Sequence, residues 1–342
     1  MNKRQTTLKD LAEKLNVSVA TVSRALKDHP RISQKTKEAV WQLAADLDYE
    51  PNQLALSFRN RQMNAIGVVV PKIIYHLYAT AISGIEDYAN AQGYNIIICQ
   101  SNESMEREKA IINELITSQV AGFIISLSSE TNNFDHFTRL QKKGIPLVFF
   151  NRECEDVDAD RVIIDNFQAS YDAVDHLIST GCRRIAYMGG PAEVQISNHR
   201  LKGYQKALAD NGITVDERLV QHCEFDKESV LSHARRLVYG PQPPEAILAF
   251  SDQIAINTMI ACKERGLKIP EDVSIVGFNN EPVTELIEPP LTTIDQPGFL
   301  MGKTAAELLV RQIENSDTVI KPEKRILSST LIIRKSTNRN RL

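Results

Sequence analysis

The chain has 342 residues, of which 42% are hydrophobic and 24% charged, so it falls in the globular range and more than one domain is expected. The net charge of −3 does not by itself suggest a nucleic-acid partner. Residues 1–61, however, carry eleven basic and seven acidic side chains, so this segment is positive and the remainder is negative. A positive head on a negative body is the asymmetry expected of a small module that contacts polyphosphate.

The cysteines and the apolar segments indicate the compartment. Five cysteines stand at long, irregular intervals without a CxxC pair, so we expect free thiols rather than disulfides or a metal site. The first ten residues, MNKRQTTLKD, lack the apolar segment of a secretory signal. No apolar run approaches the roughly 18 residues that cross a bilayer. We therefore expect a cytoplasmic protein with no membrane partner.

Residues 6–48 have the periodicity of three short helices. Thr7 and Asp10 match a capping box, in which a hydroxyl and a carboxylate satisfy each other's backbone N–H groups ahead of the first helix. Ser18 and Ser33 are suitable N-caps for the second and third helices. The segment therefore predicts a small all-α domain.

From Ala65 onward, short apolar strands alternate with amphipathic helices. The expected strands are 66–70, 95–99, 122–125, 147–150, 162–164, 184–188, 219–223, 246–250 and 274–278. The expected helices include 79–91, 106–117, 171–179, 200–209 and 253–265. This rhythm predicts parallel sheets with right-handed crossovers, and continuously apolar strands indicate sheets covered by helices on both faces.

The strand series restarts near residue 165, so we expect an α/β body of two doubly wound subdomains. The strand 291–295, the helix 304–314 and the run 325–333 would return to complete them. The expected organisation is a helix-turn-helix domain at 1–48, a hinge helix and linker at 49–63, an N-terminal subdomain of 64–163 with 296–326, a C-terminal subdomain of 164–295 with 327–337, and a polar tail at 338–342.

Residues 7–56 read TLKDLAEKLNVSVATVSRALKDHPRISQKTKEAVWQLAADLDYEPNQLAL, which strongly resembles the lactose-repressor (LacI/GalR) family of bacterial transcription regulators. The likeness continues through GIEDYA, QVAGFIIS, GIPLVFFNR, RLKGYQKAL and PPLTTIDQP, and so covers essentially the whole chain. It implies a body of periplasmic-binding-protein type, a homodimer on a near-palindromic double-stranded DNA operator, and a small-molecule effector held between the subdomains. We therefore expect a sequence-specific transcription regulator, acting as a repressor, with no cofactor or metal.

In a helix-turn-helix motif the second helix lies in the major groove with its first residues on base edges. Val19 and Ala20 take these positions here, and they can contact thymine methyls but cannot make bidentate hydrogen bonds to bases. Arg24, one turn further, can bond the O6 and N7 of guanine. The other contacts, most of them suited to phosphates, are expected from Leu8, Ser18, Thr21, Ser23, Lys27 and Arg31.

Residues 49–58 resemble the hinge helix of the family, which is too short to be stable alone in water. In the family, hinge helices from two subunits pair in the minor groove and a leucine wedges between bases. The matching residue here is Phe58, and an apolar wedge of either type can unstack a base step. The preferred step and the bend angle stay open. The other groove contacts are expected from Tyr49, Asn52, Gln53 and Ala55.

The resemblance of the body implies an effector site at the carboxyl ends of the strands. Guanidinium, amide and aromatic side chains suit a sugar, so we expect a carbohydrate effector. Arg200 stands three residues before Gly203, as the ligand arginine of the family does. The expected contacts are Tyr75, His76, Tyr78, Gln100, Ser126, Asn151, Arg152, Asp165, Arg200, Phe225, Ser251, Asp252, Asn279 and Gln296.

The sequence departs from the sugar-binding members at this site. Asn279 stands where those members tend to carry an acid, and Ser251 stands where they tend to carry asparagine. Asp252 could instead be only the N-cap of its helix. Each of the other residues could also be an ordinary polar group of a loop. The identity of the effector, and whether it releases the protein from DNA or holds it there, stay open.

Two other functions fit parts of the sequence. A solute-binding receptor of periplasmic type would share the body fold, but it would have no use for the head. Gly189-Gly190-Pro191 after a strand suggests the phosphate loop of a dehydrogenase, yet it lacks GxGxxG spacing and proline removes an N–H. No HExxH motif occurs, and no Ser/His/Asp set has a supporting context. We expect that the protein is not an enzyme.

Overall fold

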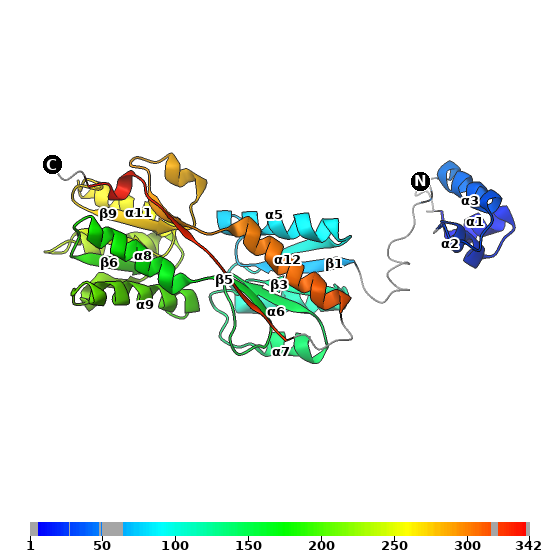
Figure 1. The fold of residues 1–342 in the computed structure, drawn as a ribbon, viewed down its shortest axis with the longest axis horizontal. Coiled ribbons are helices and arrows are strands. Elements are labelled where there is room, and N and C mark those ends of the chain that lie inside the picture. The colour runs from blue at the N-terminus through cyan, green and yellow to red at the C-terminus, as the bar shows by residue number, and fades with distance from the viewer. Residues whose placement is uncertain (1–5, 27, 48, 50–63, 316–320, 340–342) are drawn as a thin grey trace. The chain divides into compact units, whose positions relative to one another are not determined.

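The computed structural model describes residues 6–26, 28–47, 49, 64–315 and 321–339. It divides into a head that ends at Met63 and a body that begins at Asn64 (Figure 1). The predicted hinge, apart from Tyr49, lies outside the described residues. The predicted DNA contacts Lys27, Asn52, Gln53, Ala55 and Phe58 also lie outside them.

The described part of the head contains three helices, α1 (Leu8–Leu15), α2 (Val19–Leu26) and α3 (Gln34–Asp46). The predicted capping box is present: Thr7 Oγ1 accepts from the N–H of Asp10, whose carboxylate accepts from the N–H of Thr7. Ser18 and Ser33 accept from the N–H groups of Thr21 and Thr36, as expected of N-caps. The helices enclose a small core of Leu11, Ala12, Val22, Ala25, Val40 and Ala44.

The body contains two six-stranded sheets. The first has the order β11-β5-β4-β3-β1-β2, with bounds β1 (Ala65–Val70), β2 (Asn95–Gln100), β3 (Gly122–Ile125), β4 (Leu147–Phe150), β5 (Asp160–Ile164) and β11 (Lys324–Leu327). The second has the order β12-β10-β9-β8-β6-β7, with bounds β6 (Ile185–Gly189), β7 (Val220–His222), β8 (Ala246–Ala249), β9 (Ser274–Phe278), β10 (Thr292–Asp295) and β12 (Thr330–Ile332). Every pair is parallel except β10 with β12, so the predicted doubly wound architecture is confirmed.

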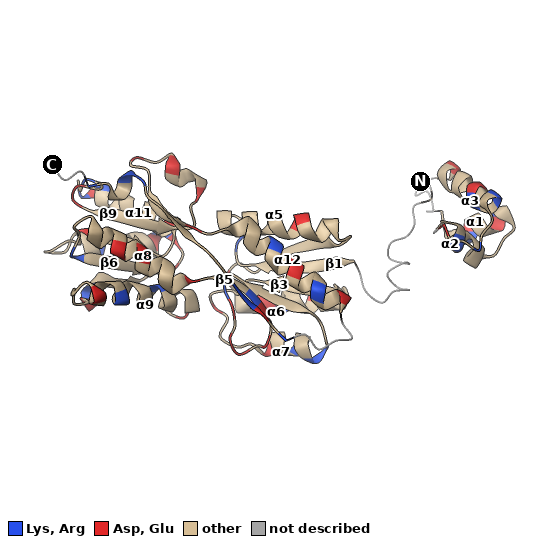
Figure 2. Cartoon of the chain, in the orientation of Figure 1, with Lys and Arg blue, Asp and Glu red and all other residues tan. Residues whose placement is uncertain are grey.

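Helices cover both sheets (Figure 1). Those of the first subdomain are α5 (His76–Ala91), α6 (Met105–Thr117), α7 (Asp135–Lys142) and α12 (Gly298–Glu314). Those of the second are α8 (Asn166–Ser179), α9 (Gln195–Asp210), α10 (Lys227–Val238) and α11 (Asp252–Glu264), with single 3-10 turns η1 (Glu217–Leu219), η2 (Pro282–Glu285) and η3 (Lys335–Thr337). Figure 2 shows charged residues on outer helices such as α12 and none on β1 or β3.

Helices α5 and α12 pack side by side at very short range (Figure 1). A Cβ on Gly302 would lie 1.9 Å from the carbonyl oxygen of Ala81, and one on Gly84 would lie 2.0 Å from that of Phe299. Only glycine at both positions lets the two backbones approach this closely. Helix α12 therefore joins the first subdomain tightly, although it follows β10 of the second.

The strands differ in burial. Central strands such as β1 and β4 are buried on both faces, but β2 and β11 are partly exposed. Both strands lie at sheet edges, where neighbours cover less of the surface, and Ile98 of β2 is 42% exposed. An apolar run in the sequence does not distinguish an edge strand from a central one.

The chain passes between the subdomains three times: after β5, after β10 and between β11 and β12. The red C-terminal run in Figure 1 follows the last passage, from the sheet that contains β5 to the one that contains β9. All five cysteines are free thiols, and four are buried. Among the described helices, none is both long and apolar enough to cross a membrane.

Candidate functional site

The predicted recognition helix, α2, buries one face and exposes the other. Val22 and Ala25 are buried in the head core, whereas Val19, Ala20 and Arg24 are exposed. The Arg24 side chain has no hydrogen bond or ion pair within the described residues. The three side chains expected to contact bases are therefore available on the outer face of one helix.

The remaining predicted residues of the head differ in exposure. Ser18 is exposed, and its hydroxyl lies 2.8 Å from that of Thr21, which is half-buried like Ser23. Arg31 is exposed. Leu8 and Tyr49 pack against the head core instead, and the N–H of Tyr49 donates to the carbonyl of Ala44.

The body holds a cavity of about 340 Å³ between its two subdomains. In each sheet, the strand that comes first in the chain, β1 or β6, lies between two later strands, and the order of the strands runs in opposite directions on its two sides. Ligands of such folds bind at this point, outside the carboxyl ends of the strands. The cavity has that position. Nine predicted effector contacts line it, namely Tyr75, Tyr78, Asn151, Arg152, Arg200, Phe225, Ser251, Asn279 and Gln296.

Arg200 projects from α9 and is only 3% exposed. Its Nε donates to Asn166 Oδ1 at 2.9 Å, and Nη1 donates to the carbonyl of Phe250. The guanidinium lies over the ring of Phe278 at 3.4 Å and over that of Phe250 at 4.6 Å. Burial lowers the pKa of Arg200 to about 9, which leaves the group charged at neutral pH. Three of its five N–H donors remain for a ligand.

Tyr78 ties two strand ends to the start of α5. Its hydroxyl accepts from Asn151 Nδ2 at 3.0 Å and lies 3.2 Å from Ser126 Oγ, and its ring meets Phe150 edge-on. Burial raises the pKa of Tyr78, so the hydroxyl stays neutral. Ser126 therefore contacts the lining residue Tyr78 but does not itself line the cavity.

Two amide side chains follow strands in backbone conformations that are unusual for residues other than glycine. Asn151 after β4 has φ +58°, and Asn279 after β9 has φ +106°. Gln296 Nε2 donates to Asn279 Oδ1 at 2.6 Å, whereas Gln296 Oε1 is buried without a partner. An unsatisfied buried acceptor in the wall of a cavity suits a ligand hydroxyl or amino group.

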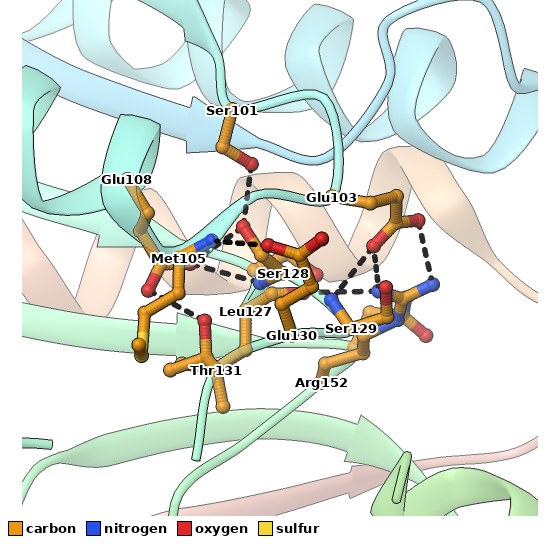
Figure 3. A network of polar contacts seen from close by, with 12 residues as sticks. Ser101, Glu103, Met105, Glu108, Leu127, Ser128, Ser129, Glu130, Thr131 and Arg152 are labelled. Carbon is orange, nitrogen blue, oxygen red and sulfur yellow. Dashed lines mark hydrogen bonds and ion pairs between the residues drawn. The ribbon is translucent and has the colours of Figure 1, made fainter. Parts of the chain in front are cut away.

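Arg152 follows Asn151 and carries the second guanidinium of the wall. Glu103 accepts from it through both carboxylate oxygens, at 2.6 and 3.1 Å, as Figure 3 shows. Nη1 also donates to the carbonyl of Leu127, and Phe225 lies 5.3 Å from the guanidinium across the cavity. The Arg152 guanidinium lowers the pKa of Glu103 against the opposing effect of burial.

Five predicted contacts do not line the cavity: His76, Gln100, Ser126, Asp165 and Asp252. Gln100 accepts from the N–H of Ile73, and Asp165 caps α8 through the N–H of Gln168. The cap of α11 is Ser251 and not Asp252, so that alternative for Asp252 is wrong.

Asp252 is buried beneath the cavity wall. Its carboxylate accepts from Thr293 Oγ1 at 2.6 Å and from the N–H of Glu281 at 2.7 Å, and burial raises its pKa to about 7. Asp252 therefore holds the loop after β9 against β10.

Leu77, between the predicted contacts His76 and Tyr78, also lines the cavity. Further wall residues were not predicted from the sequence: Ile196, Asp226, Lys227, Val230, Phe250, Gln253, Ile254, Asn257 and Glu281. Glu281 matters most, because it is an 8% exposed carboxylate that accepts from the N–H of His76 across the two subdomains. It lies three residues beyond the end of β9. The rule that parallel strands end at one edge could have identified it.

The glycines that suggested a phosphate loop have another role. A Cβ on Gly190 would lie 2.8 Å from the ring of Phe225, so the glycine lets that aromatic side chain approach the cavity. Among the described residues, no group of three or more His, Cys, Asp or Glu side chains could hold a metal ion.

Comparison with known families matches both parts of the chain. Residues 7–52 match the model of bacterial regulatory proteins of the lacI family, and residues 174–337 match a periplasmic binding protein-like domain.

Curated proteins and solved structures match along nearly the whole chain. The HTH-type transcriptional repressor CytR of Escherichia coli (strain K12) is 36% identical, over 97% of this chain and 96% of CytR. The lac repressor dimer bound to operator and the anti-inducer ONPF is 26% identical with a TM-score of 0.86, covering 98% of this chain and 99% of that one. A complex of the transcriptional regulator CelR with cellobiose is 28% identical with a TM-score of 0.74, covering 97% and 100%.

Proposed function

The chain belongs to the lacI family of bacterial regulatory proteins, and from this premise we propose that it represses transcription by binding a near-palindromic operator as a homodimer. The exposed face of α2 supports this proposal, because Val19, Ala20 and Arg24 lie together where a major-groove contact needs them. Arg24 would specify a guanine, and the two apolar residues would contact methyl groups. We place the protein with its DNA, in the bacterial cytoplasm, and assign it no catalytic activity.

We propose that the cavity of the body binds the effector, because its wall combines hydrogen-bonding groups with aromatic rings. Arg200 and Arg152 have N–H donors without a partner among the described residues, and Gln296 has a buried acceptor without one. Phe225 and Phe250 add ring faces to the same cavity of about 340 Å³. Donors, an acceptor and apolar faces together suit a carbohydrate, whose rings carry hydroxyls around their edge and C–H groups on their faces. The cellobiose complex of CelR is consistent with this class.

Effector binding would act by changing how the subdomains sit on each other. The effector would touch Arg200 of the second subdomain and Tyr78 of the first, so it would favour one arrangement of the two. Such a change would alter the spacing at which a dimer presents its two heads. A coupling of this kind is typically about 1–3 kcal/mol, or roughly 5- to 150-fold in operator affinity.

The proposal is tested by selecting a consensus operator from random duplexes with the full chain and then screening sugars for a thermal shift. We expect dimers on the operator, and a sugar that raises the melting temperature and changes operator affinity. The matched control is the same titration on a random duplex, where affinity should not respond. A monomer that binds the operator at nanomolar concentration would contradict the dimer, and indifference to every sugar that binds would contradict the control mechanism.

A further inference from the structure

The guanidinium of Arg152 lies where it can interact with a charged group of a ligand in the effector cavity. It lines that cavity and also an adjoining one of about 270 Å³. Of its five N–H donors, three are used by Glu103 and Leu127. Two donors therefore remain on a buried guanidinium, which is the group best suited to a carboxylate or phosphate.

Glu103 already supplies the negative charge that such an anion would bring to Arg152. Both of its carboxylate oxygens face Arg152, and the N–H of Ser129 donates to one of them at 2.8 Å (Figure 3). The side chains of Glu103 and Arg152 are only 12% and 10% exposed, so solvent screens the pair poorly. Glu103 is thus an internal substitute for an anionic ligand.

The backbone that presents Glu103 is in an uncommon conformation. Asn102 and Glu103 both have positive φ, +55° and +64°, in the turn between β2 and α6. Left-handed conformations are unfavourable for residues other than glycine and persist where the surroundings enforce them. Here the surroundings include the ion pair itself.

The other charges of the wall balance. Apart from Arg152, the wall carries two cations, buried Arg200 and exposed Lys227, and two carboxylates, buried Glu281 and exposed Asp226. The adjoining cavity is acidic, since Glu155, Asp156 and Glu193 line it together with Glu153, which is paired with Lys324, and Arg152 is the one basic residue among its described lining. With Arg152 neutralised, nothing in this part of the wall compensates a further negative charge.

We infer that Glu103 is a specificity-determining residue: by neutralising Arg152 it makes the cavity select uncharged polyhydroxyl compounds and reject their phosphorylated or carboxylated counterparts. This rests on the proposed function in that the same cavity binds the effector. Removal of the Glu103 charge leaves Arg152 with its full charge and free donors, so the same site then accepts an anion.

The test compares the intact full chain with E103Q by calorimetry, using inorganic phosphate, ribose and ribose 5-phosphate, with sodium chloride at matched ionic strength. The wild type should show no phosphate binding in the millimolar range. E103Q should bind phosphate and ribose 5-phosphate at least tenfold more tightly than the wild type does. The double variant E103Q/R152M, which lacks both charges, should lose that gain.

These measurements test the role of Glu103 separately from the proposal that the cavity binds a carbohydrate. Equal phosphate affinity in the wild type and E103Q overturns the inference, as does a gain that persists in E103Q/R152M. Failure of ribose and other sugars to bind the wild type, with the phosphate gain intact, instead counts against the carbohydrate effector. If E103Q does not fold, E103A takes its place, because alanine also removes the charge that neutralises Arg152. No phosphate gain in E103A then refutes the inference.

Discussion

Replacing Arg200 by methionine removes a buried charge while keeping a long side chain against the rings of Phe250 and Phe278. Two acceptors, Asn166 Oδ1 and the Phe250 carbonyl, lose their donor, at about 1–3 kcal/mol for each group left unsatisfied. The variant no longer buries a guanidinium that has no carboxylate partner, which offsets part of that loss. We expect the free energy of unfolding to fall by about 1–3 kcal/mol, enough to leave the body folded.

The effect on the effector should be much larger. Arg200 has three donors left for a ligand, and each charge-assisted hydrogen bond contributes about 1.5–3 kcal/mol. Loss of one bond therefore weakens effector binding roughly 10- to 100-fold. Because Arg200 belongs to the body, operator affinity without effector should stay within about twofold of the wild type.

The assay is fluorescence anisotropy of the selected operator, titrated with and without the sugar found by thermal shift, alongside calorimetry of that sugar. The control is Arg235→Met, which removes a surface arginine of the same subdomain that pairs with Glu264 at 2.9 Å. The control should respond to the sugar like the wild type. A normal sugar response in Arg200→Met would refute the place given to Arg200 in the site.

Three further predictions concern other parts of the chain. Arg24→Ala should reduce the binding free energy on the selected operator by about 1–3 kcal/mol and relax the preference at one base position. Arg31→Ala should weaken binding to selected and random duplexes alike. Equal losses of affinity on both duplexes in both variants would contradict the assignment of Arg24 to a base and Arg31 to a phosphate. Burial raises the pKa of Asp252 from 3.8 to about 7, so its ionisation opposes folding, and the free energy of unfolding should fall as pH rises between these values. Urea titrations of Asp252→Asn should show that fall removed, and an unchanged slope would refute it. Gly302→Ala should destabilise the body by about 1–3 kcal/mol in the same titrations, because the methyl group meets the carbonyl of Ala81; an unchanged midpoint would contradict the close packing.

The sequence predicted the fold well because its signals are local. The capping pairs around Thr7 and Ser33 and the apolar runs of β3 and β4 appear where expected. It did not distinguish an edge strand such as β2 from a central one, because exposure depends on position in the sheet. The helix predicted at 304–314 begins earlier in the structure, at Gly298 of α12, and both Gly298 and Gly302 make close contacts with α5.

The site was predicted in outline for a similar reason. Parallel strands end at one edge, so polar residues after strands were good candidates, and nine of fourteen line the cavity. The misses depend on side-chain direction, which the sequence does not record. Asp252 turns inward to Thr293, and Glu281 and Glu103 reach across from neighbouring loops.

In the proposed mechanism, the body cavity controls the affinity of the head for DNA. The most direct test is the operator dissociation constant of the intact protein, measured with the cavity empty and then saturated by a sugar whose binding requires Arg200. We predict a change of at least fivefold, the lower end of typical coupling, and no change in Arg200→Met. An operator affinity that stays constant while the sugar saturates the cavity would contradict the claim.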